Sequence, residues 1–349
     1  MRVALLHNLA ENAPQPNPDA PHDILYELDH PKTIEAFKQT LEAGGHEVFA
    51  MEGDAYLAER LKDLSIDICF NQCEGYRGDS REAQVPALLE MLGIPYTGSK
   101  VLTLALTLDK SMTKRVLMYH GLPTPPFQEF VTADDPIDPR LAVHFPLFAK
   151  PNSEGTGIGI DDRSILRSEA ELRERVAYLL HAYGEPVLVE KYIEGDDVTV
   201  GMVGNYPDLH LFPISMIAQS LFEETGLHVY GSELKIDLGD KYQYQCPAQL
   251  PDALANELRR LAIETMRVTN TLDVARVDFR LDKNDNNQPY LLEINSLPGI
   301  SPISDLTLMA EAVGWSHARL VYSVFEAALK RYGLQIDVPL HEYEEVRVR

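Results

Sequence analysis

The spacing of apolar and polar positions over the first 70 residues predicts strands that alternate with helices. Short apolar runs suit buried strands, and segments with an apolar residue every three or four positions suit helices. We expect strands at residues 3–6, 46–50 and 66–70, and helices at residues 33–43 and 55–64. This β-α-β-α-β order predicts a parallel, doubly wound sheet. The loop 11–30 is rich in Pro, Asn and Asp and leaves the sheet where ligands collect, so we expect it to be functional.

Beyond residue 80 the pattern changes to a mixture of helices, separate strands and one hairpin. Helical spacing predicts helices at residues 81–92, 104–120, 169–182, 251–270 and 315–332. Apolar or alternating runs predict strands at residues 145–150, 187–190, 198–203, 209–216, 274–281 and 289–294. The last two strands are joined by a polar turn, which is typical of a hairpin. Residues 223–245 are polar with few core positions, and they are a candidate for a mobile loop over a site.

Charge is the unusual part of the composition. The 349 residues contain 31 Lys and Arg but 54 Asp and Glu, so the formal net charge is −23. That field opposes nucleic acids and anionic membranes, because both are bound through basic residues. No apolar run has the length of a signal-peptide core or a membrane span, so we expect a cytoplasmic protein without nucleic-acid or membrane partners. Three cysteines, Cys69, Cys73 and Cys246, are too few for a disulfide framework and have no assigned role.

The predicted hairpin carries the pattern with the clearest chemical meaning. Alternate residues of a strand share a face, so Asp278 on one strand can meet Glu293 and Asn295 on the other. Two carboxylates and an amide oxygen form an all-oxygen site that suits Mg²⁺. A solvated strand face is the alternative interpretation. Glu293 argues against it, because this carboxylate interrupts an otherwise buried run and there needs a partner or a metal.

Two further segments have functional interpretations that are weak when each is taken alone. Lys150 ends a predicted strand and precedes Gly155, Gly157 and Gly159, an order that lets backbone N–H groups and an ammonium surround phosphate oxygens. It matches neither a P-loop nor a dinucleotide fingerprint, and an ordinary turn is the alternative. The segment 189–197 leaves a strand with polar and aromatic residues suited to a purine, and a plain turn is again the alternative.

Taken together, these segments resemble the ATP-grasp superfamily and, within it, the D-alanine–D-alanine ligase family. The resemblance extends from about residue 93 to residue 319, with a looser match before it. The strings that carry it are LGIPYTGS (92–99), LDK (108–110), GLP (121–123), AKP (149–151), VEKYI (189–193), YQCPA (244–248) and LEINSLPG (292–299).

The resemblance implies an ATP-grasp fold of mixed α/β and α+β class with an N-terminal Rossmann-like domain of parallel sheet. It implies a substrate-side domain at residues 1–97, a central ATP-grasp subdomain at 98–185, a C-terminal subdomain with the Mg²⁺ site at 186–335, and a tail at 336–349. The implied activity is ATP-dependent ligation of a carboxylate to an amine through an acyl phosphate. The resemblance also implies ATP and two Mg²⁺ ions as cofactors, with Mn²⁺ able to substitute for Mg²⁺. It further implies amino-acid substrates and a homodimer.

The resemblance also assigns roles to residues of this chain. The residues at the family's positions are Lys110, Lys150, Thr156 and Gly157 for the phosphates; Glu190, Lys191, Ile193 and Asp197 for adenosine; Asp278, Glu293 and Asn295 for Mg²⁺; Arg276 and the Gly299 N–H for the oxyanion; Lys235 for the γ-phosphate; and Ser304 for the second substrate.

Departures from the family pattern lie at the substrate positions more than at the ATP positions. The family's Gly-Gly-x-Ser-x-Glu string is missing, and residues 70–79 replace its His-Gly…Gly-Glu-Asp-Gly string. Thr156-Gly157 stands where the family has two serines, and Lys235 lacks the family's neighbouring tyrosine. An altered substrate pocket follows from these changes. The residues that are candidates for recognising its substrate are Glu11, Glu27, Glu74, Arg77, Asp79, Ser304 and Asp305.

Several functions stay open at this point. A D-alanine dipeptide ligase and a ligase for another amino acid or carboxylate differ only in the altered pocket. An inactive ATP-binding regulatory protein is disfavoured, because Arg276, Asp278, Glu293 and Asn295 are all present. A dinucleotide oxidoreductase is disfavoured as well, because no glycine fingerprint follows the first strand.

Overall fold

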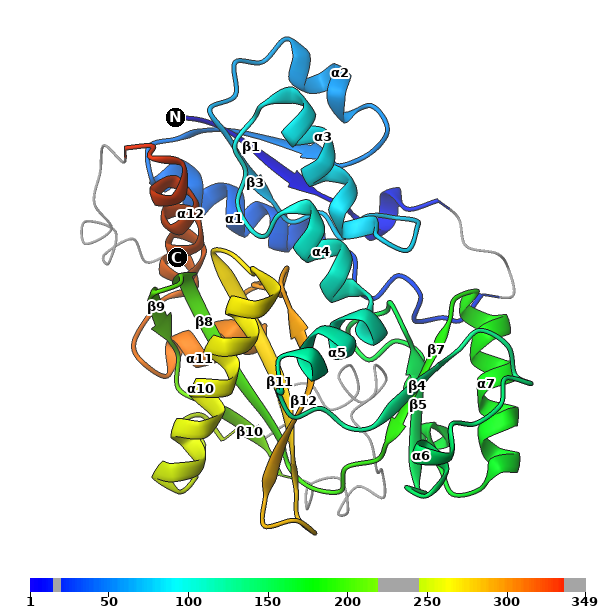
Figure 1. The fold of residues 1–349 in the computed structure, drawn as a ribbon. Coiled ribbons are helices and arrows are strands. Elements are labelled where there is room, and N and C mark those ends of the chain that lie inside the picture. The colour runs from blue at the N-terminus through cyan, green and yellow to red at the C-terminus, as the bar shows by residue number, and fades with distance from the viewer. Residues whose placement is uncertain (15–19, 219–244, 336–349) are drawn as a thin grey trace.

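Three β-sheets, each with its own helices, make up the chain (Figure 1). The structure is a computed structural model, and it describes residues 1–14, 20–218 and 245–335. The predicted lid at 223–244, with Lys235, and the tail at 336–349 lie outside the described residues. Within the described ranges, no helix combines the length and the apolar character that crossing a membrane requires.

The first sheet confirms the parallel arrangement expected from the N-terminal pattern. Its strands are β1 (Arg2–His7), β2 (Glu47–Glu52) and β3 (Ile68–Asn71), in the order β2-β1-β3. The helical elements of this part are η1 (Ala10–Asn12), α1 (Pro31–Ala43), α2 (Leu57–Lys62), η2 (Arg81–Ala83) and α3 (Gln84–Leu92). Helix α1 begins with proline at its first position, and it buries Ile34, Phe37 and Leu41 on one face.

The second sheet is antiparallel and carries the glycine-rich loop. Its order is β4 (Phe127–Phe130), β7 (Val187–Lys191), β5 (Leu147–Pro151) and β6 (Ile165–Leu166). The helices α4 (Val101–Leu108) and α5 (Lys110–Tyr119) precede it in the chain, and α6 (Pro139–Ala142), η3 (Asp162–Ser164) and α7 (Glu169–Tyr183) belong to it. Strand β7 pairs with β4 and β5 inside this sheet.

The third sheet holds the predicted hairpin. Its main order is β10 (Ser215–Ile217), β8 (Asp197–Asn205), β11 (Val274–Asp282) and β12 (Gln288–Asn295), and β9 (Asp208–Leu211) pairs with β8. The helices that follow β10 along the chain are α10 (Asp252–Thr269), α11 (Asp305–Glu311) and α12 (His317–Tyr332). Figure 1 shows the second and third sheets side by side below the first, with α4 and α5 between them.

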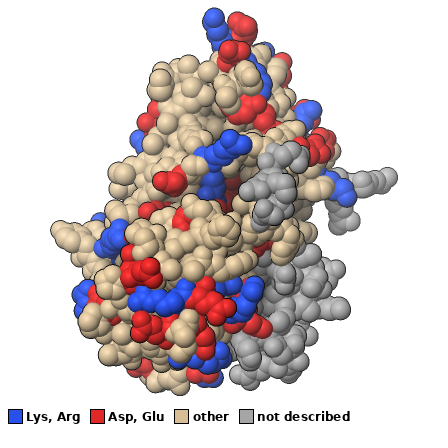
Figure 2. All heavy atoms as spheres, turned by 90° about the vertical axis from the view of Figure 1, so that its right-hand side faces the viewer, with Lys and Arg blue, Asp and Glu red and all other residues tan. Residues whose placement is uncertain are grey.

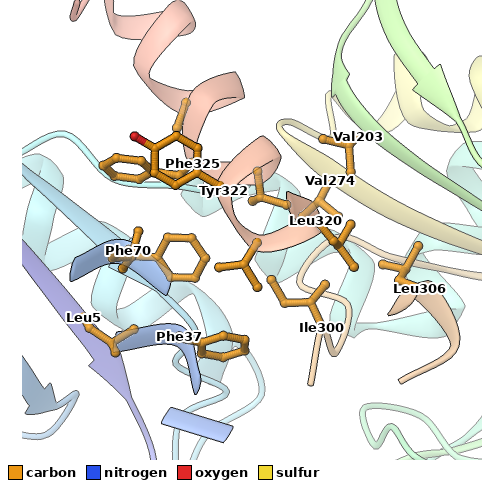
Figure 3. Packing of buried hydrophobic residues seen from close by; sticks show 14 of the residues in the cluster. Leu5, Phe37, Phe70, Val203, Val274, Ile300, Leu306, Leu320, Tyr322 and Phe325 are labelled. Atoms are coloured by element: carbon orange, nitrogen blue, oxygen red, sulfur yellow. The ribbon is translucent and has the colours of Figure 1, made fainter. Parts of the chain in front are cut away.

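Helix α12 connects the first sheet to the third through one buried core. Tyr322 and Phe325 lie near Phe70 and Phe37 at one end, and Leu320 lies near Val203 and Val274 at the other (Figure 3). Full burial of each such side chain stabilises the fold by about 1.5–3 kcal/mol. This shared core fixes the N-terminal loops relative to the hairpin.

Three predicted elements are divided in the structure. The expected helix at 104–120 is two helices, because Asp109 has an extended backbone and its carboxylate accepts a hydrogen bond from the Met112 N–H. The expected strand at 209–216 is interrupted between β9 and β10, and the helix at 81–92 begins with the 3₁₀ turn η2. The first division has a functional consequence, because it puts Lys110 at the start of a helix.

Candidate functional site

The hairpin brings the three predicted metal ligands together. Arg276 pairs with Asn295 and Asp278 pairs with Glu293, and directly opposed residues of antiparallel strands share a face. The Asn295 Nδ2 group donates to Asp278 at 3.0 Å, and Thr199 donates to the other oxygen of Asp278, also at 3.0 Å. A register shift follows Asp278, where a β-bulge re-aims the strand. Asp278 and Glu293 line the cleft, and Asn295 lines a smaller cavity that shares Glu293 with it. Oxygen ligands of this kind suit a hard divalent cation.

Arg276 lies at the centre of the charges on this face. Its Nη2 is 2.9 Å from Asp278, and its Nη1 is 3.5 Å from Asp305 at the start of α11. Burial alone would lower the pKa of the guanidinium, but the two carboxylates raise it above its usual value. Asp305 therefore pairs with Arg276. Ser304 caps α11 by accepting a hydrogen bond from the Thr307 N–H, and Gly299 is exposed in the loop between β12 and α11.

Lys110 reaches this face from the opposite wall of the cleft. Its ammonium donates to the Glu154 carbonyl oxygen at 2.5 Å and lies 3.5 Å from the Glu293 carboxylate. The break at Asp109 makes this position possible, because it starts α5 at Lys110. A predicted phosphate-binding lysine and a predicted metal ligand thus belong to one site, although 183 positions separate them (293 − 110 = 183).

A buried set of three charges lies on the second sheet's side of the cleft, where Lys150 and Glu190 line the pocket and Lys114 does not. Glu190 is 3.2 Å from Lys150 and 2.7 Å from Lys114. Burial by itself would raise the pKa of the Glu190 carboxyl, but the two ammonium groups hold it below its ordinary value. Burial also lowers the pKa of Lys114, whose side chain is fully enclosed. The sequence did not indicate Lys114, because it lies at a helical position with no motif around it.

The glycine-rich loop forms part of the wall of the cleft. Gly155, Gly157 and Ile158 line the pocket, whereas Thr156 is exposed with φ of +55°. That left-handed conformation is unfavourable for a β-branched residue, and such strain is often found at ligand-binding loops. The Gly159 N–H donates to Asp23 of the N-terminal loop at 2.9 Å. This bond ties the glycine-rich loop to the loop that the sequence indicated as functional.

The far end of the cleft has the residues predicted for adenosine. Ile193 is buried and lines the pocket, and Lys191 donates to Asp282 at 3.0 Å. Asp197 lines the pocket and accepts two hydrogen bonds from Arg280, at 2.6 and 2.7 Å. The complete cleft encloses about 1150 Å³, including space open to solvent. It runs from this end to the hairpin, so one extended ligand can touch both.

The cleft is lined by five basic side chains and by six acidic ones. On the face shown in Figure 2, basic side chains are interspersed with acidic ones. The basic residues that line the cleft are Lys110, Lys150, Lys191, Arg276 and Arg280. These cations are available to contact an anionic ligand although the chain carries a net charge of −23.

The N-terminal candidates separate into three places. Glu27 and Glu74 line a small cavity that also touches Lys110, Glu293 and Asn295, which we call the inner acidic cavity. Arg77 and Asp79 line a second pocket farther out, together with Glu27. Glu11 is exposed in η1 and lines none of the pockets described for residues 1–14, 20–218 and 245–335.

Two residues at or beside the inner acidic cavity, Arg81 and Glu82, were not among the candidates predicted from the sequence. Glu82 from η2 lines the inner acidic cavity, and Arg81 beside it binds both Glu27, at 2.5 Å, and Glu154, at 3.0 Å. The ion pairs join η2, the N-terminal loop and the glycine-rich loop. The sequence contained one signal for this region: residues 70–79 stand in place of a family string, and that segment ends just before Arg81 and Glu82.

Comparison with known proteins identifies the family. The family model described as D-ala D-ala ligase C-terminus matches residues 116–326, which is more than half of the chain. The chain belongs to the D-alanine–D-alanine ligase family. A D-alanine–D-alanine ligase of Bordetella petrii is 36% identical over 285 residues, which cover 80% of this chain and 81% of that protein. An uncharacterized protein of Sinorhizobium fredii, y4sG, is 32% identical over 346 residues, with 95% of this chain and 98% of the relative covered.

The family's fold is also found among solved structures. The crystal structure of a D-alanine–D-alanine ligase from Bacillus anthracis complexed with ATP matches with a TM-score of 0.72 at 23% identity. The match covers 95% of this chain and 99% of that one. It confirms the ATP-grasp fold with a parallel N-terminal sheet that the resemblance implied.

Proposed function

We propose that the chain is an ATP-dependent carboxylate–amine ligase that forms an amide bond through an acyl phosphate. Membership of the D-alanine–D-alanine ligase family supports the general reaction. The observation that carries the proposal is the meeting of Lys110 with Glu293, 3.5 Å apart, opposite Arg276 and Asp278. Groups for phosphate, for a metal and for a developing oxyanion are all present in one cleft.

The reaction needs these groups for identifiable reasons. A donor carboxylate oxygen attacks the γ-phosphorus of ATP, and the bond from phosphorus to the leaving ADP oxygen breaks. Lys110 and Lys150 would hold phosphate oxygens. Asp278, Glu293 and Asn295 would hold Mg²⁺, which when bound neutralises phosphate charge. Lys235, proposed for the γ-phosphate, lies outside the described residues.

The second half of the reaction makes the amide. The amine nitrogen attacks the acyl carbon, the carbon–oxygen bond to phosphate breaks, and a proton leaves the nitrogen. Arg276 and the Gly299 N–H would hold the oxyanion that forms between these events, and a donor of this kind contributes about 3–4 kcal/mol. The Asp305 carboxylate, 3.5 Å from Arg276, would help orient the guanidinium. Ser304 would then receive the second substrate at the start of α11.

The identity of the donor is a separate part of the proposal. The first-substrate strings of the family are absent here, and Glu27, Arg81 and Glu154 form an ion-pair cluster near the expected donor position. This arrangement favours a donor other than D-alanine. The uncharacterized relative y4sG, similar along nearly the whole chain, leaves the substrate open.

One assay tests both parts. The purified protein is incubated with ATP, Mg²⁺ and pooled D- and L-amino acids, and ADP, phosphate and product mass are measured. We expect ADP and phosphate in equal amounts, together with a product whose mass is that of two substrates less one water. A product that is alanylalanine would contradict the altered pocket. No ADP with any pool would contradict the ligase and would favour an inactive ATP-binding regulatory protein.

A further inference from the structure

The inner acidic cavity shares Lys110, Gly155 and Glu293 with the cleft. Its walls include Glu27, Glu74 and Glu82 from the N-terminal part, and Lys110 and Glu293 from the cleft. A molecule in this cavity can therefore place one end beside the lysine and the predicted metal ligand. Its other end would lie among three carboxylates.

Two of these carboxylates have no counter-charge in contact. Glu27 is bound to Arg81, which is shared with Glu154. Within the described residues, neither Glu74 nor Glu82 is hydrogen-bonded or ion-paired, and Glu82 is only 8% exposed. Unpaired buried carboxylates destabilise a fold, so a cation bound beside them would be stabilising.

Mutual repulsion reinforces that cost. Burial, followed by the nearby charge of Glu27, raises the pKa of Glu82 to about 8. Burial and the charges of Glu27 and Glu82 raise the pKa of Glu74 well above its ordinary value. The attraction of a cation placed between the carboxylates would offset both the desolvation cost and the repulsion.

The outer wall of the cavity is held in a fixed position. The Glu27 carboxylate lies against the glycine-rich loop so closely that a Cβ at Gly155 would be 2.0 Å from its oxygen. Asp23, in the same N-terminal loop, accepts hydrogen bonds from the Gly159 N–H and from Tyr183. The spacing between the carboxylates and Lys110 is therefore set by the fold, which favours a ligand of defined length.

We propose that the inner acidic cavity holds the two ammonium groups of a diamino carboxylic acid, and that this molecule is the acyl donor. The inference rests on the proposed ligase function. A monoamino acid brings one ammonium and would leave one of the two carboxylates without a partner. A diamino acid supplies both, while its own carboxylate points toward Lys110 and the phosphate. Attack of that carboxylate on ATP releases ADP, as described above for any donor.

The experiment uses hydroxylamine as the amine, so that the natural acceptor need not be known. Hydroxylamine nitrogen attacks the acyl phosphate, phosphate leaves, and the hydroxamate is measured together with ADP. The donors are 2,3-diaminopropionate, 2,4-diaminobutyrate, ornithine and lysine, in both stereochemical forms. Their controls of equal carbon chain are alanine, 2-aminobutyrate, norvaline and norleucine. We expect at least one diamino acid to exceed its control in kcat/KM by about tenfold or more, because an added charged hydrogen bond is formed.

Variants link the preference to the cavity. In Glu82→Gln, and independently in Glu74→Gln, the KM for the preferred diamino acid should rise about tenfold or more, while the KM for ATP stays within about twofold. The control is Glu257→Gln, which removes the same charge from the exposed face of α10. It should leave both constants unchanged. Glutamine matches glutamate in size, so we expect both variants to fold. If one does not, the KM of the other still tests the assignment of the cavity.

Each remaining outcome has a defined meaning. Turnover that favours the monoamino controls would overturn the diamino donor and leave the ligase standing. If no donor gives ADP, calorimetric titration of the four diamino acids in the presence of a non-hydrolysable ATP analogue decides. Binding weakened by Glu82→Gln supports the cavity assignment without the ligase, and no binding overturns both. Binding of Mn²⁺ that is lost in Glu82→Gln would overturn the organic cation in favour of a metal.

Discussion

Two acidic regions face Lys110, and they differ in how their charges are balanced. On the hairpin, Asp278 contacts Arg276, Asn295 and Thr199, and Asp305 contacts Arg276. Of the three N-terminal carboxylates in the inner acidic cavity, Glu27 alone has such a partner among the described residues. The hairpin is thus organised before any ligand arrives, whereas the cavity carries an electrostatic cost that a ligand can remove.

This difference separates general chemistry from specificity. Groups that act on ATP meet the same phosphates in every turnover, so a fixed, self-neutralised arrangement suits them. Groups that select a donor are effective when the wrong donor leaves them unpaired, because an unpaired buried charge is costly. The balanced region would therefore set the reaction, and the unbalanced region would set its substrate.

The largest expected effect concerns the buried charges of Lys114, Glu190 and Lys150, which are balanced like those of the hairpin. Lys114→Met leaves buried Glu190 with Lys150 as its remaining ammonium partner and should reduce the free energy of unfolding by about 3–5 kcal/mol. Urea unfolding followed by circular dichroism measures the change. The matched control is Lys38→Met, which breaks the exposed pair with Glu42 and should alter stability by about 0.5 kcal/mol or less. If Lys114→Met reduces the free energy of unfolding by less than about 1 kcal/mol, Glu190 does not depend on Lys114 for its charge balance.

Arg276→Ala tests the hairpin by activity rather than stability. Removing the oxyanion donor should lower the rate of hydroxamate formation by about 10² to 10³, while nucleotide affinity stays within a few-fold. Arg115→Ala, at an exposed pair with Glu129, is the control and should retain full activity. An Arg276→Ala enzyme with normal turnover would exclude the oxyanion role and leave the arginine as a partner for Asp278 and Asp305.

The pH dependence of stability tests the unbalanced side. The pKa of Glu82 is about 8 in the folded chain and near 4.5 when unfolded, so between these values the folded state binds more protons. Its contribution to stability is therefore present at low pH and is lost as pH rises from about 5 to 8, with a slope up to about 1.4 kcal/mol per pH unit. Glu82→Gln should flatten the measured curve in this window. Identical curves for both proteins would mean that Glu82 is already balanced.

The sequence predicted the hairpin side well because its determinants are local. Alternation on two strands and a polar turn set the register that opposes Asp278 to Glu293, so pairing alone brings the ligands together. The parallel N-terminal sheet followed in the same way from apolar runs spaced by helices. These features require only periodicity, and tertiary contacts do not reverse them.

The cavity could not be predicted in this way. Glu27, Glu74 and Glu82 come from a loop, a strand exit and a 3₁₀ turn, and only the packing of three segments brings them together. Nothing near Arg81 in the sequence shows that it will bind Glu154, 73 positions away. The departures from the family strings indicated which region differs, but they did not show which of its carboxylates would have a positively charged partner. The break at Asp109 was missed for a related reason, since one side chain there outweighs a strong helical pattern.

Asp109→Ala is expected to give the smallest effect, and it refines the comparison beside Lys110, the residue that both regions share. Asp109 caps α5 through the Met112 N–H and accepts a hydrogen bond from Asn152 at 2.8 Å, so its loss should cost about 1 kcal/mol. Because Lys110 is the next residue, the KM for ATP should rise a few-fold as well. Asp138→Ala removes the cap of α6, which lines none of the described pockets, and should leave the KM for ATP unchanged. Asp109→Asn keeps a capping oxygen and should restore both quantities. If Asp109→Ala lowers stability with no change in KM, Lys110 is positioned by its contacts with Glu154 and Glu293 rather than by the helix start.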